Sequence, residues 1–214
     1  MKKMVLALVL ITGAVFAYAQ ANLPNYQAVS GRWSMIGGRL QQTDERARLA
    51  RLNVRVPQAS DIMTYEFDAK YEGGAEDGHA GFGIHVFVDN AFSREAWGAG
   101  RSVLLWLNYD EKPLTSDIPK GFSAQVYRSL SNTDMRLVES IDLNEFFYYV
   151  TDNDLLQAWP IKIVINSNTG ETRIYDPVDS TIYYYFYLDR SYLPLRGEWV
   201  VLRTNGMKAS FTAQ

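Results

Sequence analysis

The chain contains no cysteine, and this absence removes several kinds of site at once. Thiol nucleophiles, cysteine-ligated metals and disulfide crosslinks are all excluded. The 214 residues must therefore be held together by a hydrophobic core alone. An all-β domain of this size can bury enough apolar surface to fold without covalent crosslinks.

Positive charge is scarce as well. The chain has 21 Lys and Arg against 24 Asp and Glu, which gives a formal net charge of −3, and no basic tract interrupts the sequence. Proteins that bind nucleic acid or anionic membranes usually concentrate positive charge on one face. The composition therefore argues against both kinds of partner.

Long apolar runs are confined to the start of the chain. Lys2 and Lys3 precede the apolar residues 4–16, and Ala17-Tyr18-Ala19 supplies the small residues of a cleavage site. This pattern predicts a secretory signal peptide over residues 1–19. We expect a single domain over 20–214, with no membrane span after cleavage and a periplasmic or extracellular location.

Alternation of apolar and polar residues is abundant. It is most regular between Ile62 and Tyr109, in the runs 62–71, 82–89 and 103–109, and it recurs over 121–129. A period of two residues is typical of half-buried strands. The sequence therefore predicts an all-β, two-sheet antiparallel sandwich in which these strands form one wall.

Two local signals modify this pattern. Pro57 is expected to end the strand before it, because proline cannot donate to a β-ladder. Asp142 followed by Glu145 resembles a helix capping box, which predicts a small helical insertion near 142–159.

The order of strands and turns resembles the concanavalin A-like lectin/glucanase superfamily, whose jelly-roll includes laminin-G-like modules. The resemblance extends over nearly all of residues 20–214. Its markers are Trp33, the Gly37-Gly38 turn, the Asn168-Thr169-Gly170 turn and the strand that begins near Trp199. It implies two stacked sheets, of which the concave one would bind carbohydrate or protein.

Some glucanases of that superfamily carry Glu-x-Asp-x-Glu on one strand. Glu66 and Asp68 match two of these positions, but Lys70 stands where the second glutamate belongs. Retaining glycosidases need two carboxylates facing one sugar. The broken motif predicts that the protein is not an enzyme, and glycoside hydrolase is the third of three functional hypotheses.

The first hypothesis is a binding module that recognises a glycan or a protein through the mixed face of the sheet, because aromatic planes and planar polar groups suit sugars. The alternative for these side chains is that the helical insertion or loops cover them. The candidate ligand-binding residues, with Phe87 on the same face, are Glu66, Asp68, Lys70, His85, Asp89, Trp106, Asn108, Gln125 and Tyr127.

No cofactor is expected. The two histidines are too few for a metal centre. Calcium held by loop oxygens around Asp77, Gly78, Asp89 and Asn90 is the weaker alternative.

The second hypothesis is a structural component of an envelope or periplasmic filament assembly. It would associate with itself or with an envelope protein through exposed aromatic residues. The candidate interface residues are Phe92, Trp97, Tyr183, Tyr185 and Tyr187.

Overall fold

The computed structural model describes residues 26–74, 80–90, 94, 96–144, 157–188 and 190–213. The predicted signal peptide, Asp77, His79 and Phe92 lie outside these residues. Most of the predicted helical insertion, residues 145–156, lies outside them too. In the described part of the chain, no helix has the length and apolar character needed to cross a bilayer.

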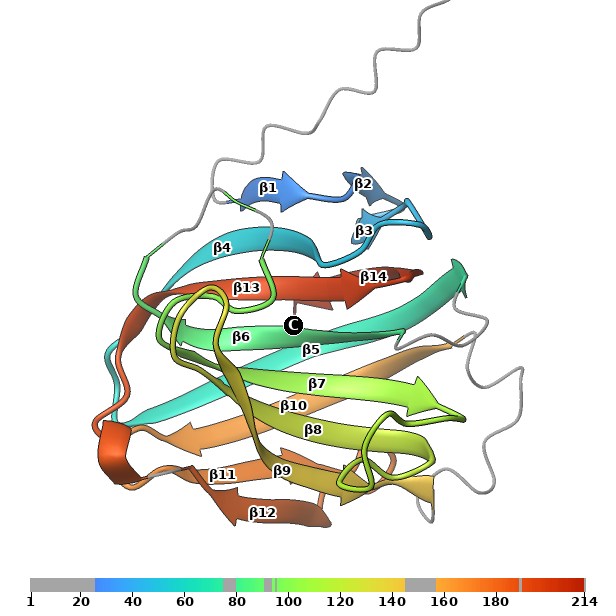
Figure 1. Cartoon of the computed structure of the whole chain (residues 1–214). Coiled ribbons are helices and arrows are strands. Elements are labelled where there is room, and N and C mark those ends of the chain that lie inside the picture. The colour runs from blue at the N-terminus through green and yellow to red at the C-terminus, as the bar shows by residue number, and fades with distance from the viewer. Residues whose placement is uncertain are drawn as a thin grey trace, which may run out of the picture.

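Two seven-stranded antiparallel sheets stack face to face (Figure 1). The first sheet has the order β1 (Tyr26–Ser30), β4 (Ala50–Gln58), β13 (Gly197–Asn205), β6 (Gly81–Val88), β7 (Ser102–Asp110), β8 (Gly121–Ser129) and β9 (Met135–Asp142). The second sheet has the order β12 (Tyr183–Tyr187), β11 (Glu171–Tyr175), β10 (Ala158–Asn166), β5 (Ile62–Gly74), β14 (Met207–Ala213), β3 (Arg39–Gln42) and β2 (Trp33–Ile36). A short 3₁₀ turn, η1 (Arg190–Tyr192), precedes β13. The predicted two-sheet antiparallel jelly-roll is confirmed.

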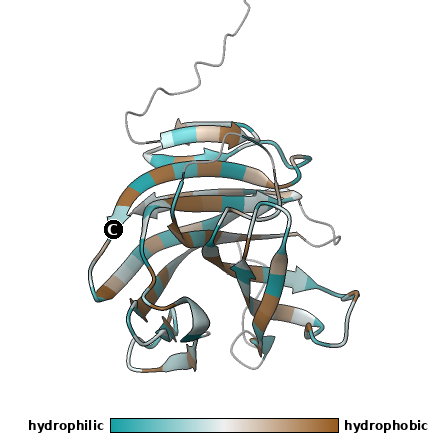
Figure 2. Cartoon of the chain, turned by 60° about the vertical axis from the view of Figure 1, so that its left-hand side comes forward, coloured by the Kyte–Doolittle hydropathy of each residue, from teal (hydrophilic) through white to brown (hydrophobic). Residues whose placement is uncertain are grey.

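The core lies between the sheets, and Figure 2 shows the alternating hydropathy along the strands that creates it. Ile84 and Val126 of the first sheet meet Ile163 and Ile165 of the second, and all four are almost fully buried. Each such side chain contributes about 1.5–3 kcal/mol relative to an exposed one. This core takes the place of the absent disulfides.

The last two strands of the chain lie inside the sheets rather than at their edges. β13 pairs with β4 on one side and with β6 on the other. β14 pairs in the same way with β3 and β5. Segments far apart in sequence thus complete the middle of each sheet.

The predicted three-strand wall is wrong for β5, which belongs to the second sheet. Its partners are β10, where Tyr65 lies opposite Ile163, and β14, where Ala69 lies opposite Phe211. β6 and β7 do pair with each other, in the first sheet. Alternation specifies which face of a strand is buried but not which strand lies beside it, and here the partners of β5 come from the end of the chain.

A β-bulge interrupts β6. Two of its residues, Val86 and Phe87, lie opposite Val200 alone, and Phe87 has a φ of 56°. A positive φ is uncommon for a bulky residue and is held only where the surroundings fix it. The bulge turns Phe87 into the core, where its ring meets that of Tyr65 edge-on at 6.3 Å between centroids.

The bulge also shifts the phase of the residues that follow. The sequence places Val88 with the core and Phe87 on the mixed face, and both assignments are wrong. Val88 packs on the outer face with Ala99 and Val201. A bulge inserts one residue into the period of two, so every later side chain changes face.

Pro57 does not end its strand, since β4 continues to Gln58. The register of β13 shifts between Gly197 and Trp199, opposite this point. On the other side of β4, the pairing with β1 extends only to Val54. The strand accommodates Pro57 because its missing N–H falls where the ladder is interrupted.

Candidate binding site at one end of the sandwich

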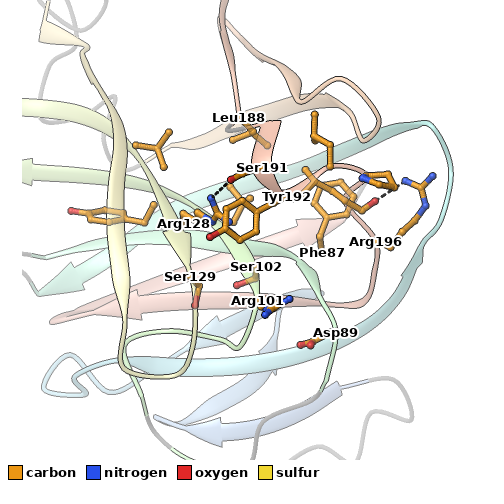
Figure 3. Close-up of a pocket in the computed structure, with 16 residues that line it drawn as sticks. Phe87, Asp89, Arg101, Ser102, Arg128, Ser129, Leu188, Ser191, Tyr192 and Arg196 are labelled. Carbon is orange, nitrogen blue, oxygen red and sulfur yellow. Dashed lines mark hydrogen bonds between the residues drawn. The ribbon is translucent and has the colours of Figure 1, made fainter.

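A cavity of about 620 Å³ lies at one end of the sandwich, where β6 ends, β7 begins and β8 ends (Figure 3). Leu188 and residues 191–196, the latter including part of η1, form its opposite wall. Cavities of several hundred Å³ accommodate small organic ligands and sugar units. The sequence does not predict this site, because its walls come from five separate segments.

The floor of the cavity is apolar and the rim is polar. Phe87, Val103, Leu188 and Leu195 belong to the core or pack against it. The polar lining consists of Asp89, Arg101, Ser102, Tyr127, Arg128, Ser129, Ser191, Tyr192 and Arg196. An apolar floor with convergent hydrogen-bonding groups is typical of small-ligand sites.

The bulge in β6 is held in place by Gln58, whose side chain is fully buried. Its Oε1 accepts hydrogen bonds from the Tyr65 hydroxyl at 2.6 Å and from the Phe87 backbone N–H at 2.8 Å. Its Nε2 donates to the Trp199 carbonyl at 2.8 Å. One side chain therefore ties β4, β6 and β13 to β5 of the opposite sheet beneath the cavity.

The wall formed by η1 is fixed from both sheets. The guanidinium of Arg128, on β8, lies over the ring of Tyr192 and donates to Ser191 Oγ at 3.4 Å. Leu195 N–H donates to the Ser167 carbonyl at 2.8 Å. Tyr192 remains partly exposed at the mouth of the cavity.

The predicted ligand-binding residues fall on three surfaces. Asp89 and Tyr127 line the cavity. Glu66, Asp68 and Lys70 lie on the outer face of the second sheet, because β5 belongs to that sheet. The outer face of the first sheet carries His85, Trp106, Asn108 and Gln125. The shared surface predicted for all nine residues does not form.

The outer face of the first sheet is covered by the segment between β6 and β7. Trp97 meets Trp106 and Tyr127 edge-on, with ring centroids 6.2 and 5.7 Å apart. Trp106 is consequently only 5% exposed, and its indole lies across Gly81, where a Cβ would be 2.7 Å from the ring. The alternative, in which loops cover these aromatic residues, is therefore correct for Trp106. Trp97 packs onto the sheet.

Arg203 anchors this segment through its Nη1, which donates to the Trp97 carbonyl at 2.7 Å and to His85 Nε2 at 2.9 Å. Arginine has no acceptor, so Nε2 must accept and the imidazole proton lies on Nδ1. That proton is donated to Ser102 Oγ at 3.0 Å. The network therefore contains a neutral histidine in one tautomer.

A second buried arginine lies opposite Arg203 on β4. Arg51 donates to the carbonyls of Arg94 and Gly98, in the same covering segment. Burial lowers the pKa of Arg51 to about 10, so it stays charged at neutral pH. Burial, together with the charges of Arg203 and Arg51, holds the pKa of His85 well below its ordinary value.

The low pKa of His85 predicts that the protein is less stable in mild acid. The unfolded chain takes up a proton near the ordinary histidine pKa of about 6.5, whereas the folded protein does not. The contribution of the neutral His85 to the free energy of unfolding is complete above that pH. It is lost as the pH falls, by at most about 1.4 kcal/mol per pH unit. The free energy of unfolding of wild type and His85→Gln can be measured with urea at several pH values between 7 and 5. It should fall less steeply with decreasing pH in the variant than in the wild type.

Ser102→Ala provides the matched control. It removes the hydrogen bond at Nδ1 but leaves His85 buried beside Arg203, so the slope should persist. Equal slopes for wild type and His85→Gln would show that His85 is protonated in the folded state.

The carboxylates of β5 take part in surface ion pairs. Glu66 Oε1 lies 2.7 Å from Lys162 Nζ, and this hydrogen bond raises the pKa of Lys162. Lys70 Nζ lies 3.3 Å from Glu72. Glu66 therefore interacts with lysine on an open face.

The predicted tyrosine interface lies on β12, an edge strand among the described strands. Tyr183, Tyr185 and Tyr187 are all exposed, and Arg173 of β11 lies over the Tyr183 ring at 5.1 Å. Their exposure is compatible with a contact surface. Self-association through them stays a prediction.

Sequence reasoning missed seven of the nine polar residues that line the cavity, among them Arg101, Arg128, Tyr192 and Arg196. Arg128 lies on the apolar side of an alternating strand, which is a signal that could have been noticed. The described residues contain no cluster of three His, Asp or Glu side chains that could hold a metal. Calcium near Asp77 and Gly78 stays a prediction, because both lie outside them.

At the level of sequence, no protein-family model and no curated protein matches the chain. Several solved structures, however, are similar to the chain in fold. Carbohydrate-binding module CBM66 from Bacillus subtilis is 13% identical over 88% of this chain and 92% of that one, with a TM-score of 0.56.

Two further structures are similar at lower scores. Peanut lectin is 12% identical over 91% of this chain and 93% of its own, with a TM-score of 0.51. A provisionally assigned glycosyl hydrolase from Parabacteroides distasonis is 10% identical over 88% and 85%, with a TM-score of 0.50. The chain has a concanavalin A-like jelly-roll fold.

Proposed function

We propose that the protein is an exported, non-catalytic module that binds a glycan in the cavity at the end of the sandwich. The observation that carries this proposal is the cavity itself, with its apolar floor, its polar rim and the partly exposed ring of Tyr192. The similarity to a carbohydrate-binding module and to a lectin supports it. Export rests on the predicted signal peptide.

The lining of the cavity suits a sugar unit. A pyranose presents C–H groups on its faces, which pack on aromatic rings, and hydroxyls at its edges, which need donors and acceptors. Tyr192 supplies a ring, Asp89 an acceptor, and Arg101 donors. A unit held at the mouth could contact all three.

The number and location of the carboxylates favour binding of a glycan over its hydrolysis. Among the described residues that line the cavity, Asp89 is the one carboxylate. Glycoside hydrolysis ordinarily requires an acid and a second carboxylate on opposite sides of the scissile bond. Glu66 and Asp68 lie on the outer face of the other sheet and do not complete such a pair.

Tyr192→Ala is the variant that tests the site. It should weaken binding to the best polysaccharide from a glycan array by about tenfold or more, because stacking on an aromatic ring contributes about 1 kcal/mol beyond area burial. Isothermal titration calorimetry with the wild type and the variant measures the change. A thermal unfolding scan of each protein separates loss of the site from loss of the fold.

Tyr26→Ala is the matched control, because Tyr26 is 37% exposed and Tyr192 is 38% exposed. Tyr26 lies on β1 at the opposite side of the first sheet and should leave affinity unchanged. Equal affinity of the wild type and Tyr192→Ala would place the glycan elsewhere. Failure of the wild type to bind any glycan on the array would contradict the proposed function.

A further inference from the structure

The described residues that line the cavity carry a net positive charge, on a protein whose net charge is negative. Its described lining holds three arginines, Arg101, Arg128 and Arg196, and one acid, Asp89, which makes a formal charge of +3 − 1 = +2. No lysine, glutamate or histidine is among these residues. A recessed site of one sign concentrates ligands of the other sign.

The three arginines are engaged to different degrees. Arg196 donates to Ser167 Oγ and to Asn168 Oδ1, and it lies 3.7 Å from Asp61. Arg128 is nearly buried beneath Tyr192. Both positions are fixed by the protein, and Asp61 offsets part of the charge of Arg196, so Arg128 is the main source of positive potential inside the cavity.

Arg101 differs from the other two. Its side chain is exposed at the start of β7, and no described carboxylate lies within ion-pair distance, Asp89 included. Figure 3 shows Arg101 and Asp89 on the side of the cavity away from Ser191 and Tyr192. A planar guanidinium in this position can donate two parallel hydrogen bonds to a carboxylate or a sulfate.

We infer that the cavity selects an acidic glycan, in which a carboxylate or sulfate group binds Arg101 while the sugar ring lies toward Tyr192. This inference rests on the proposed function, because it specifies the ligand of the same site. Asp89 then orients the anion by repelling it toward Arg101 and accepts from a sugar hydroxyl.

The probes are four oligosaccharides of defined charge. Hexagalacturonate carries carboxylates, and its fully methyl-esterified form has the same rings without charge. A κ-carrageenan hexasaccharide carries sulfates, and its desulfated form has the same rings without charge. Calorimetry with the full-length protein should show that each acidic oligosaccharide binds at least tenfold more tightly than its neutral partner. If the site prefers carboxylate over sulfate or the reverse, only the oligosaccharide with the preferred group should show this difference. Higher salt should narrow the difference.

Arg101→Gln should weaken binding of the preferred acidic probe by about tenfold or more, since the charge-assisted hydrogen bonds between the guanidinium and the anion are lost. It should change the affinity for the neutral partner little. Arg46→Gln is the matched control, because Arg46 is exposed and lies in the turn before β4, at the opposite end of the first sheet.

The outcomes separate the two proposals. Tighter binding of neutral than acidic probes, sensitive to Tyr192→Ala, would overturn the inference and leave the proposed function standing. Equal loss of acidic binding in Arg101→Gln and Arg46→Gln would overturn the inference by showing non-specific attraction. Absence of binding to all four probes, with binding to an uncharged polysaccharide on the array, would also overturn it.

Discussion

Gln58→Leu is expected to lower the free energy of unfolding by about 3–5 kcal/mol. The substitution conserves the approximate size of the side chain but removes the amide NH2 donor group and the carbonyl acceptor. It leaves the Tyr65 hydroxyl, the Phe87 N–H and the Trp199 carbonyl without their partner at a fully buried position. Each buried group that loses its hydrogen bond costs about 1–3 kcal/mol, and the three losses occur together.

Guanidinium unfolding at pH 7, followed by tryptophan fluorescence, measures this change. Tyr65→Phe removes only one of the three bonds and should cost about 1 kcal/mol. Gln41→Leu, on a half-buried position of β3, is the size-matched control and should cost less than about 0.5 kcal/mol. A Gln58→Leu protein as stable as Gln41→Leu would show that water replaces the lost partners.

Arg203→Met is expected to cost about 3 kcal/mol and to loosen the segment over the first sheet. Arg203 is 1% exposed and donates to the Trp97 carbonyl and to His85. Methionine fills similar volume but can make neither bond. The Trp97 carbonyl, the His85 ring and the stacking of Arg203 on Trp97 would all lose their partner.

The same variant offers a second readout, because Trp97 packs against Trp106 and Tyr127. Release of the segment should increase quenching of tryptophan fluorescence by acrylamide under native conditions. Arg55→Met is the control, since the Arg55–Glu198 ion pair is exposed and such pairs contribute about 0–1 kcal/mol. Unchanged quenching in Arg203→Met would mean that the aromatic contacts hold the segment alone.

The fold class was predictable because burial follows local alternation. Val103, Leu105 and Leu107 face the core as their spacing requires, and Val126 does so on β8. The pairing of strands was not predictable in the same way. β5 has the pattern of β6, yet β10 and β14 flank it, and nothing within Ile62–Gly74 identifies these partners.

The bulge shows a different limit. Phe87 continues the period of two in the sequence, and only the pairing of β6 with β13 reveals the inserted residue. Gln58 follows a proline in a stretch whose composition is typical of a turn, although its side chain is fully buried and hydrogen-bonded. Polar residues that satisfy tertiary hydrogen bonds have no periodic signature.

The candidate site was only partly predictable for the same reason. Asp89 and Tyr127 were singled out on the mixed face of a sheet that was predicted to be concave, whereas they line a cavity at the end of the sandwich. The arginines and Tyr192 come from strand ends and a loop, where spacing predicts no direction for a side chain. The aromatic and polar composition that led to the prediction of a sugar site carries no information about where on the fold such a site lies.

The positions of β13 and β14 have a consequence for synthesis on the ribosome. Until β13 and β14 have been synthesised, each sheet lacks an inner strand, so β4, β6, β3 and β5 each present an unpaired edge. Exposed edges pair readily with other chains. Closure of both sheets is therefore expected to wait for β13 and β14.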